Sequence, residues 1–169
     1  NNNFLTCTGK KYLIGRYGED RSAMLRGSHI EKEGRTIHLG IDIFSQLRED
    51  IFCPFDGVIV RKGYESGPFS YGYYVMLKHN VKGFTFYTFY GHLSKELPIA
   101  INLKKGEKFA RIGDYKNNEN GGWSRHLHFQ LLLELPEEET PQGYASKEKF
   151  SHISTLYPDP NFVLQLPFL

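Results

Sequence analysis

The sequence predicts an all-β fold, a single antiparallel sheet or sandwich domain over residues 1–169. Aromatic residues make up 15% of the chain, glycines number 17, and apolar and polar residues alternate in several short segments. Aromatic and β-branched residues favour strands, and glycine supplies turns between them. A chain of 169 residues is also long enough to bury a real core. We expect that core at 36–133, a loose lead-in at 1–12 and a C-terminal extension at 136–169.

The clearest strand pattern runs from Thr36 to Phe44. Isoleucine and leucine alternate there with His38, Gly40 and Asp42. Period-two alternation with β-branched residues is typical of a strand. We therefore expect one strand with His38 and Asp42 on the same face.

The dipeptide Asp56-Gly57 is the strongest hairpin signal in the chain. It lies between apolar segments at 51–55 and 58–62, which predicts two strands joined by a tight turn. Further strands are expected at 71–79, 84–90, 108–112 and 126–133.

Helix signals are few. We expect a short helical turn near Ser94–Leu97 and a second helix near Ser146–Ser151. The glycine-rich stretch Asn117–Gly122 and the acidic stretch Pro136–Pro141 predict loops, the latter solvated. The end of the chain, Pro158–Leu169, contains three prolines and is expected to be extended.

Composition argues against several classes of protein. A net charge of +2 without a long Lys/Arg run does not suggest binding to nucleic acid. No apolar stretch approaches the roughly 18–20 residues that a membrane span needs. Cys7 and Cys53 alone cannot make a cysteine-based zinc site. We expect Cys53 to be a small buried apolar residue and Cys7 to be a thiol in the lead-in, although a single bridge remains open.

His38 and Asp42 are candidate metal ligands. In a straight strand, four residues span about 13 Å, which is too far for two ligands of one ion. Gly40 lies midway, and glycine is where a strand can kink or bulge. An imidazole and a carboxylate are a normal pair of zinc ligands.

Three further histidines accompany this pair. His126 and His128 share a strand face, about 6.6 Å apart along the backbone, so one can bind an ion while the other lies just outside. His92 follows an aromatic strand in the sequence Tyr-Gly-His. The remaining three histidines are expected to be structural: His29, His79 and His152.

Candidate substrate contacts lie near these histidines. Trp123 and Arg125 precede His126, and Tyr90 precedes His92. Arg125 could contact a substrate carboxylate, and the aromatic rings could line a groove. Glu19 and Arg21 are expected to form an ordinary surface pair.

The motifs His38-Leu-Gly-Ile-Asp42, Tyr90-Gly-His92-Leu-Ser and His126-Leu-His128-Phe-Gln, in this order, resemble the lysostaphin-type (LytM-like) zinc metalloendopeptidases of bacteria. The resemblance implies an antiparallel β fold of the duplicated-hybrid-motif type with Zn²⁺ in an open groove. It implies His38, Asp42 and His128 as ligands, with His92 and His126 as catalytic histidines.

A narrower similarity extends over most of the chain. The segments Gly15–Arg21, Asn120–Trp123 and Pro158–Asn161 resemble the peptidase-like domain of some class III aminotransferase fusion proteins. Such fusions are expected in the cytoplasm, whereas peptidases that cut the cell wall act outside the membrane. The compartment and the oligomeric state therefore stay open.

These observations predict a zinc-dependent endopeptidase that hydrolyses amide bonds in peptidoglycan cross-links or related peptides. His126 is assigned as the general base and His92 as the partner of the oxyanion, roles that could be exchanged. Two alternatives are a non-catalytic module that binds peptide or cell wall, and a zinc hydrolase of small amides in a fusion-type context.

Overall fold

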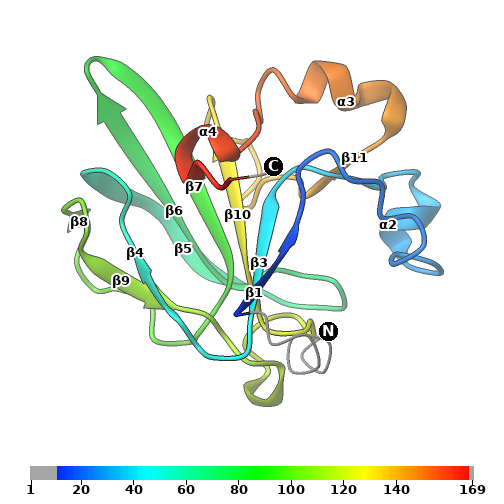
Figure 1. The fold of residues 1–169 in the computed structure, drawn as a ribbon, viewed down its shortest axis with the longest axis horizontal. Helices are drawn as coiled ribbons and strands as arrows, with labels where there is room; N and C mark the ends of the chain where they lie inside the picture. The colour runs from blue at the N-terminus through cyan, green and yellow to red at the C-terminus, as the bar shows by residue number, and fades with distance from the viewer. Residues whose placement is uncertain (1–10, 168–169) are drawn as a thin grey trace.

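The computed structural model describes residues 11–167 of the chain (Figure 1). Most of the expected lead-in, Cys7 included, lies outside these residues, and Tyr12 already begins a strand. The strands are β1 (Tyr12–Gly15), β2 (Ile37–His38), β3 (Ile41–Ser45), β4 (Asp50–Phe52), β5 (Gly57–Glu65), β6 (Gly72–Val81), β7 (Phe84–Leu93), β8 (Asn102–Leu103), β9 (Lys108–Arg111), β10 (His126–Leu132) and β11 (Tyr144–Ala145). The helices are α2 (His29–Lys32), the 3₁₀ turn η1 (Tyr115–Asn117), α3 (Lys147–Ile153) and α4 (Asn161–Leu164).

Seven strands form one large sheet in the order β1-β3-β10-β7-β6-β5-β8. Every neighbouring pair in it is antiparallel, which confirms the predicted fold class. The long strands β6 and β7 meet at a tight turn where Lys82 and Gly83 both have positive φ, at 52° and 86°. Glycine adopts this left-handed backbone without the steric penalty of a side chain.

The large sheet buries apolar side chains on both faces. Val75 and Leu77 of β6 belong to one apolar cluster, whereas Tyr74 and Met76 belong to a second. The first cluster lies against the small sheet of β4 and β9, because Ile51 and three residues from Phe109 to Ile112 join it. Figure 1 shows β4 and β9 on one side of the large sheet and α2, β11 and α3 on the other.

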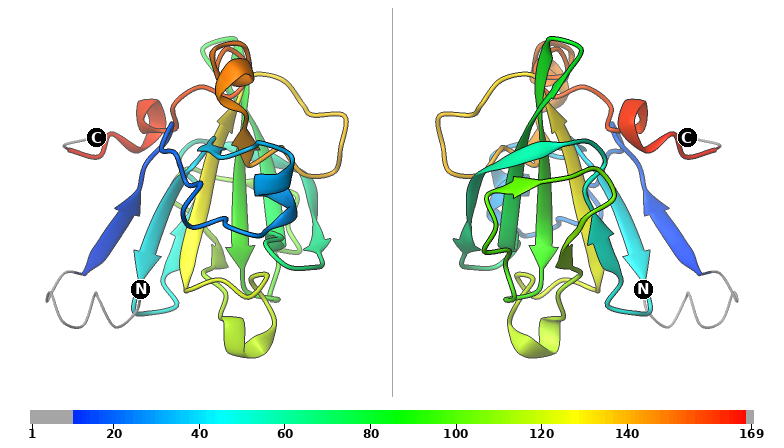
Figure 2. Two further views of the ribbon diagram at one scale, coloured as in Figure 1. Left: turned by 90° about the vertical axis from the view of Figure 1, so that its right-hand side faces the viewer. Right: turned by 90° about the vertical axis from the view of Figure 1, so that its left-hand side faces the viewer.

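Strand β10 lies inside the large sheet, between β3 and β7, and is buried along its whole length. Leu127 and Phe129 point into the first apolar cluster. Alternation along the strand turns His126, His128 and Gln130 to the opposite face. Helix α2 lies over this face (Figure 2, left).

The predicted single strand at 36–44 is instead two strands in different sheets. Strand β2 pairs with β11, whereas β3 pairs with β1 and β10. The chain turns at Leu39 and Gly40, where the Leu39 amide donates a 3.0 Å hydrogen bond to the carbonyl of Gly143. Gly40 is required there because a Cβ atom would clash with the ring of His128 and lie 2.9 Å from the Phe129 carbonyl oxygen.

The hairpin predicted at Asp56-Gly57 is wrong. Strand β4 pairs with β9, and β5 pairs with β6 and β8. Asp56 accepts a 2.9 Å hydrogen bond from the Lys105 amide, so it fixes a corner between the two sheets. Distant partners thus override the local turn signal, as is common for strands.

Helices are short and lie at the edges of the sheet. The helix expected near Ser146 is confirmed as α3, and the Ser146 hydroxyl caps it by accepting from the Lys149 amide at 3.3 Å. The turn expected at Ser94–Leu97 is not helical. The segment at 158–169 is not extended throughout, because α4 lies within it. No helix in the described part of the chain is long and apolar enough to cross a membrane.

Gly40→Ala is expected to destabilise the protein by about 1–3 kcal/mol, because the added methyl overpacks the interior against His128 and a backbone carbonyl. Urea unfolding measures the effect. Gly63→Ala is the matched control, since its added methyl meets mainly the outer end of the Tyr74 side chain. Equal unfolding midpoints for the two variants would contradict the role of Gly40.

Candidate metal centre and catalytic groove

Three side chains from three strands converge on one point. Nε2 of His38 lies 3.3 Å from Nδ1 of His128 and 3.4 Å from Oδ1 of Asp42. Nδ1 of His128 lies 2.9 Å from the same Asp42 oxygen. All three residues are buried, with at most 3% of their surface exposed.

This triangle of atoms has the dimensions of a metal site. Two ligand atoms on a tetrahedral zinc ion, each at about 2.0–2.1 Å, are about 3.3–3.4 Å apart. The two distances from His38 match this separation, and the distance from His128 to Asp42 is shorter by a few tenths of an ångström. The kink at Gly40 is what brings His38 and Asp42 together. These are the three residues that the resemblance in sequence implied as ligands.

Hydrogen bonds determine which nitrogen of His38 faces the cluster. Its Nδ1 lies 2.9 Å from the backbone carbonyl of Arg16. A carbonyl only accepts, so Nδ1 carries the proton and Nε2 presents its lone pair to Asp42 and His128. A second partner that orients a histidine in this way is typical of metal ligands.

Gln130 sets the opposite orientation for His128. The side-chain nitrogen of Gln130 donates to the Gln142 carbonyl at 3.2 Å, which turns its Oε1 toward Nε2 of His128 at 3.1 Å. His128 must then donate through Nε2 and present the Nδ1 lone pair to the cluster. Three acceptor atoms therefore face one another with no donor between them, and a bound cation would remove their mutual repulsion. The donor set of two imidazoles and one carboxylate suits zinc.

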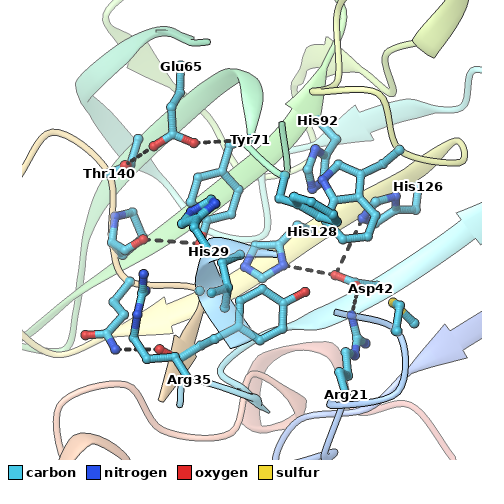
Figure 3. A pocket seen from close by; sticks show the side chains of 18 of the residues that line it. Arg21, His29, Arg35, Asp42, Glu65, Tyr71, His92, His126, His128 and Thr140 are labelled. Atoms are coloured by element: carbon cyan, nitrogen blue, oxygen red, sulfur yellow. Dashed lines mark hydrogen bonds and ion pairs between the residues drawn. The ribbon is translucent and has the colours of Figure 1, made fainter. Parts of the chain in front are cut away.

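Arg21 holds the other side of the Asp42 carboxylate. Its NH1 donates to Oδ2 of Asp42 at 2.5 Å, which leaves Oδ1 for the cluster (Figure 3). The expected pair of Glu19 and Arg21 is present at 3.8 Å, but Arg21 is only 4% exposed, so the expectation of an ordinary surface pair is wrong. Burial opposes ionisation of Asp42, but His38, His126 and Arg21 together hold the pKa of its carboxyl well below its usual 3.8.

His92 and His126 lie beside the cluster with ring centroids 4.2 Å apart. Nδ1 of His92 donates to the Asn120 carbonyl at 3.0 Å, and Nδ1 of His126 donates to the Ser124 carbonyl at 2.6 Å. Each ring therefore keeps an Nε2 lone pair. Burial lowers the pKa of both imidazoles, and for His92 the neighbouring rings of His126 and His128 lower it further. Both are neutral at neutral pH and able to accept a proton.

Different features of the fold position His126 and His92. The His126 ring stacks on Phe44, its partner across the β3–β10 pair, at 4.7 Å between centroids. His92, the second-to-last residue of β7, has a positive φ of 60°, an uncommon conformation for a residue other than glycine. Sparsely populated backbone conformations cluster at functional sites.

The cluster opens into a cavity of about 660 Å³. Asp42, His92, His126 and His128 line its floor, and Figure 3 shows them together with residues of the walls. Parts of α2 and of the loop before β11 complete the walls. The acidic stretch expected to be a solvated loop thus contributes residues to the cavity, among them Glu138, Thr140 and Pro141.

The three predicted substrate contacts have different locations. Trp123 lines the cavity. Tyr90 does not: it is 2% exposed and its ring packs on Phe109 and Phe129 in the core, so its assignment to the groove is wrong. Arg125 is also outside the cavity lining, because an ion pair with Asp114 and a hydrogen bond to the Gln46 carbonyl hold its guanidinium.

The sequence motifs did not identify the residues that orient His38, Asp42 and His128 through hydrogen bonds. Gln130 continues the alternation of His126 and His128, a signal that could have identified it. Arg21 and the carbonyl of Arg16 are distant in sequence from the ligands that they contact, and no local pattern marks them. Among the histidines expected to be structural, His29 lines the cavity, whereas His79 is buried with bonds to the Asp56 carbonyl and to Thr88.

Sequence comparison identifies a family over most of the chain. The sequence model of Peptidase family M23 matches residues 36–140, a span that contains the three cluster residues and both neighbouring histidines. No curated protein matches the chain in sequence.

Solved structures share the fold at low sequence identity. The catalytic domain of the antimicrobial peptidase lysostaphin from Staphylococcus simulans is 20% identical, with 98% of each chain covered and a TM-score of 0.60. LytU is 20% identical, with 93% of this chain and 86% of that chain covered and a TM-score of 0.55. The catalytic domain of the prophage-encoded M23 protein EnpA from Enterococcus faecalis is 18% identical, with 83% and 92% covered and a TM-score of 0.52.

Arg21→Met is expected to destabilise the metal-free protein by about 3–5 kcal/mol, because it leaves the Asp42 carboxylate buried without its partner. Urea unfolding with a chelator present, followed by circular dichroism, measures this. Arg111→Met is the matched control: its pair with Asp50 is solvent-exposed, and little change is expected. Similar midpoints for both variants would contradict the structural role of Arg21.

The metal-free protein is expected to lose stability as the pH falls below about 6.5. Burial keeps the pKa of His38, His92 and His126 below 6.5 in the folded state, so the unfolded state binds more protons in this range. Each of these histidines contributes a slope of about 1 kcal/mol per pH unit between its folded pKa and 6.5. Above 6.5 this contribution is fully present.

Urea midpoints at pH 7.5, 6.5 and 5.5 test this expectation. The double variant with His92→Asn and His126→Asn should show a shallower loss, because two of the buried titrating groups are gone. A wild-type midpoint that stays constant or rises from pH 6.5 to 5.5 would rule out the burial of neutral histidines.

Proposed function

Because the chain belongs to peptidase family M23, we propose that it is a zinc-dependent endopeptidase that hydrolyses amide bonds of peptidoglycan cross-links or related peptides. The observation that carries the proposal is the convergence of three lone pairs, from His38, Asp42 and His128, beside two neutral histidines in an open cavity. Zinc bound by these three residues would supply a Lewis acid that makes a water molecule more acidic and polarises the scissile carbonyl.

His126 is proposed as the general base. Its Nε2 lies 3.8 Å from Oδ1 of Asp42, so it is adjacent to the cluster and its lone pair can take a proton from an attacking water. The Ser124 carbonyl fixes the tautomer that makes this possible. A protonated His126 can then deliver the proton to the leaving amine nitrogen.

His92 is proposed as the partner of the developing oxyanion. It can donate through Nε2 only after that nitrogen has taken a proton from solvent, because Nδ1 already donates to the Asn120 carbonyl. Burial and the neighbouring rings lower its pKa, and negative charge developing on the substrate would raise it again. Since both rings present an Nε2 lone pair, the two roles can be exchanged.

A non-catalytic binding module would not need this arrangement. Such a module requires neither a complete ligand set nor two neutral histidines beside it, and all five positions are filled here. The expected similarity to the aminotransferase-fusion domain, and with it the hydrolysis of small amides, stays a prediction.

Asp42→Ala is expected to lose zinc and activity together, whereas His92→Asn should keep zinc and lose about 100-fold or more in turnover. Asparagine suits this position because it tolerates the left-handed backbone at residue 92. Metal content by mass spectrometry and hydrolysis of purified peptidoglycan and of a panel of short peptides measure both effects.

His152→Asn, on the exposed side of α3, is the matched control and should retain both properties. The mechanism is wrong if protein stripped of metal hydrolyses its substrate as fast as zinc-loaded protein. Zinc binding without hydrolysis of any tested amide would favour the binding module.

A further inference from the structure

Two aromatic rings stand at the cavity that contains His92 and His126. Phe69 lies in the loop between β5 and β6, and Trp123 lies in the loop before β10. Their rings pack edge to face with centroids 5.3 Å apart, and both residues line the cavity. Phe69 remains 37% exposed. The Trp123 ring lies 6.2 Å from those of both His92 and His126. The corner of the cavity formed by Phe69 and Trp123 is therefore next to the proposed catalytic histidines.

The two loops are locked together through their backbones. Gly121 has a φ of 69°, and a Cβ atom there would clash with the carbonyl oxygen of Ser70. A Cβ atom at Gly72 would likewise clash with the carbonyl oxygen of Glu119. The backbones that carry Phe69 and Trp123 are therefore packed against each other before a ligand arrives, which lowers the entropic cost of binding.

Phe69 has an unfavourable backbone conformation. Its φ is 65°, in the left-handed region that bulky residues rarely occupy. Such conformations persist where the surrounding structure imposes them, and they cluster at ligand-binding sites. Across the cavity, the ring of His29 lies 6.5 Å from that of Phe69, so the corner is closed on a second side by α2.

The chemistry of the corner suits an apolar group. Met24 and Ile30 line the same cavity. The Nε1 atom of Trp123 is inaccessible and has no hydrogen-bond partner among the described residues, so the accessible part of the indole is carbon. An apolar side chain that packs on the carbon surfaces of these two rings loses no hydrogen bond, whereas a hydroxyl placed against the same surfaces loses one.

We propose that Phe69 and Trp123 form a subsite for a bulky apolar or aromatic side chain of a peptide, on a residue that flanks the scissile bond. The inference rests on the proposed peptidase function and narrows its substrates to the related peptides, because peptidoglycan cross-links carry no bulky apolar side chain. A preference of about tenfold over glycine is expected, the lower end of what a hydrophobic pocket delivers.

Binding can be measured without hydrolysis, because Trp123 is the single tryptophan of the chain and its fluorescence reports on this corner. Zinc-loaded His92→Asn protein is titrated with N-acetyl-phenylalanine amide, N-acetyl-glycine amide and N-acetylglucosamine. The phenylalanine compound should bind about tenfold more tightly than the other two. Equal affinities, or tighter binding of the sugar, would overturn the subsite.

Phe69→Gly removes the ring and also relieves the left-handed backbone, so this variant should fold at least as well as the wild type. In the His92→Asn background it should lose the preference for the phenylalanine compound. Phe162→Ala, an exposed aromatic on α4 outside the cavity, should keep it. A preference that survives Phe69→Gly would exclude Phe69 from the subsite.

Cleavage of a mixed peptide library by the zinc-loaded wild type separates the two proposals. Bonds flanked by phenylalanine, leucine or tyrosine should be cut about tenfold faster than bonds between glycines, and Phe69→Gly should remove the difference. Cleavage without this preference overturns the subsite and leaves the peptidase. Selective binding of the phenylalanine compound without cleavage of any peptide overturns the peptidase and leaves the subsite.

Discussion

The site depends on three hydrogen-bond acceptor atoms that the fold places close together in the interior. His38, Asp42 and His128 present one lone pair each to a common point, and the nearest distances are 2.9–3.4 Å. All three are buried, so water cannot screen the repulsion between them. A bound cation would relieve this repulsion, and the proposed zinc chemistry rests on that.

A second layer of contacts makes this arrangement rigid. Backbone carbonyls of Arg16, Asn120 and Ser124 accept from Nδ1 of three histidines, and the Gln130 amide accepts from Nε2 of the fourth. Arg21 occupies the remaining oxygen of Asp42. These partners fix each tautomer, which decides whether a ring acts as a ligand or as a base.

Much of the site could be predicted because its residues follow local rules. His126 and His128 alternate along one strand, and Gly40 between His38 and Asp42 indicates the kink that joins them. The hairpin at Asp56-Gly57 was wrong because β4 and β5 find better partners in different sheets. Tyr90 was wrongly placed in the groove because it lies two residues before His92, and a regular strand would put both on one face. The register shift in the β6–β7 pair and the positive φ of His92 break this alternation, so Tyr90 packs in the core instead.

The sequence by itself determined the fold class and which histidines and aspartate to consider for the site, because alternation along a strand and short motifs are local properties of the chain. Only the tertiary structure decided the rest. Arg21 contacts Asp42, and Phe69 contacts Trp123, because segments that are far apart in the sequence pack together in the fold. Contacts of this kind depend on how strands are ordered in the sheet, and no local pattern of residues records that order.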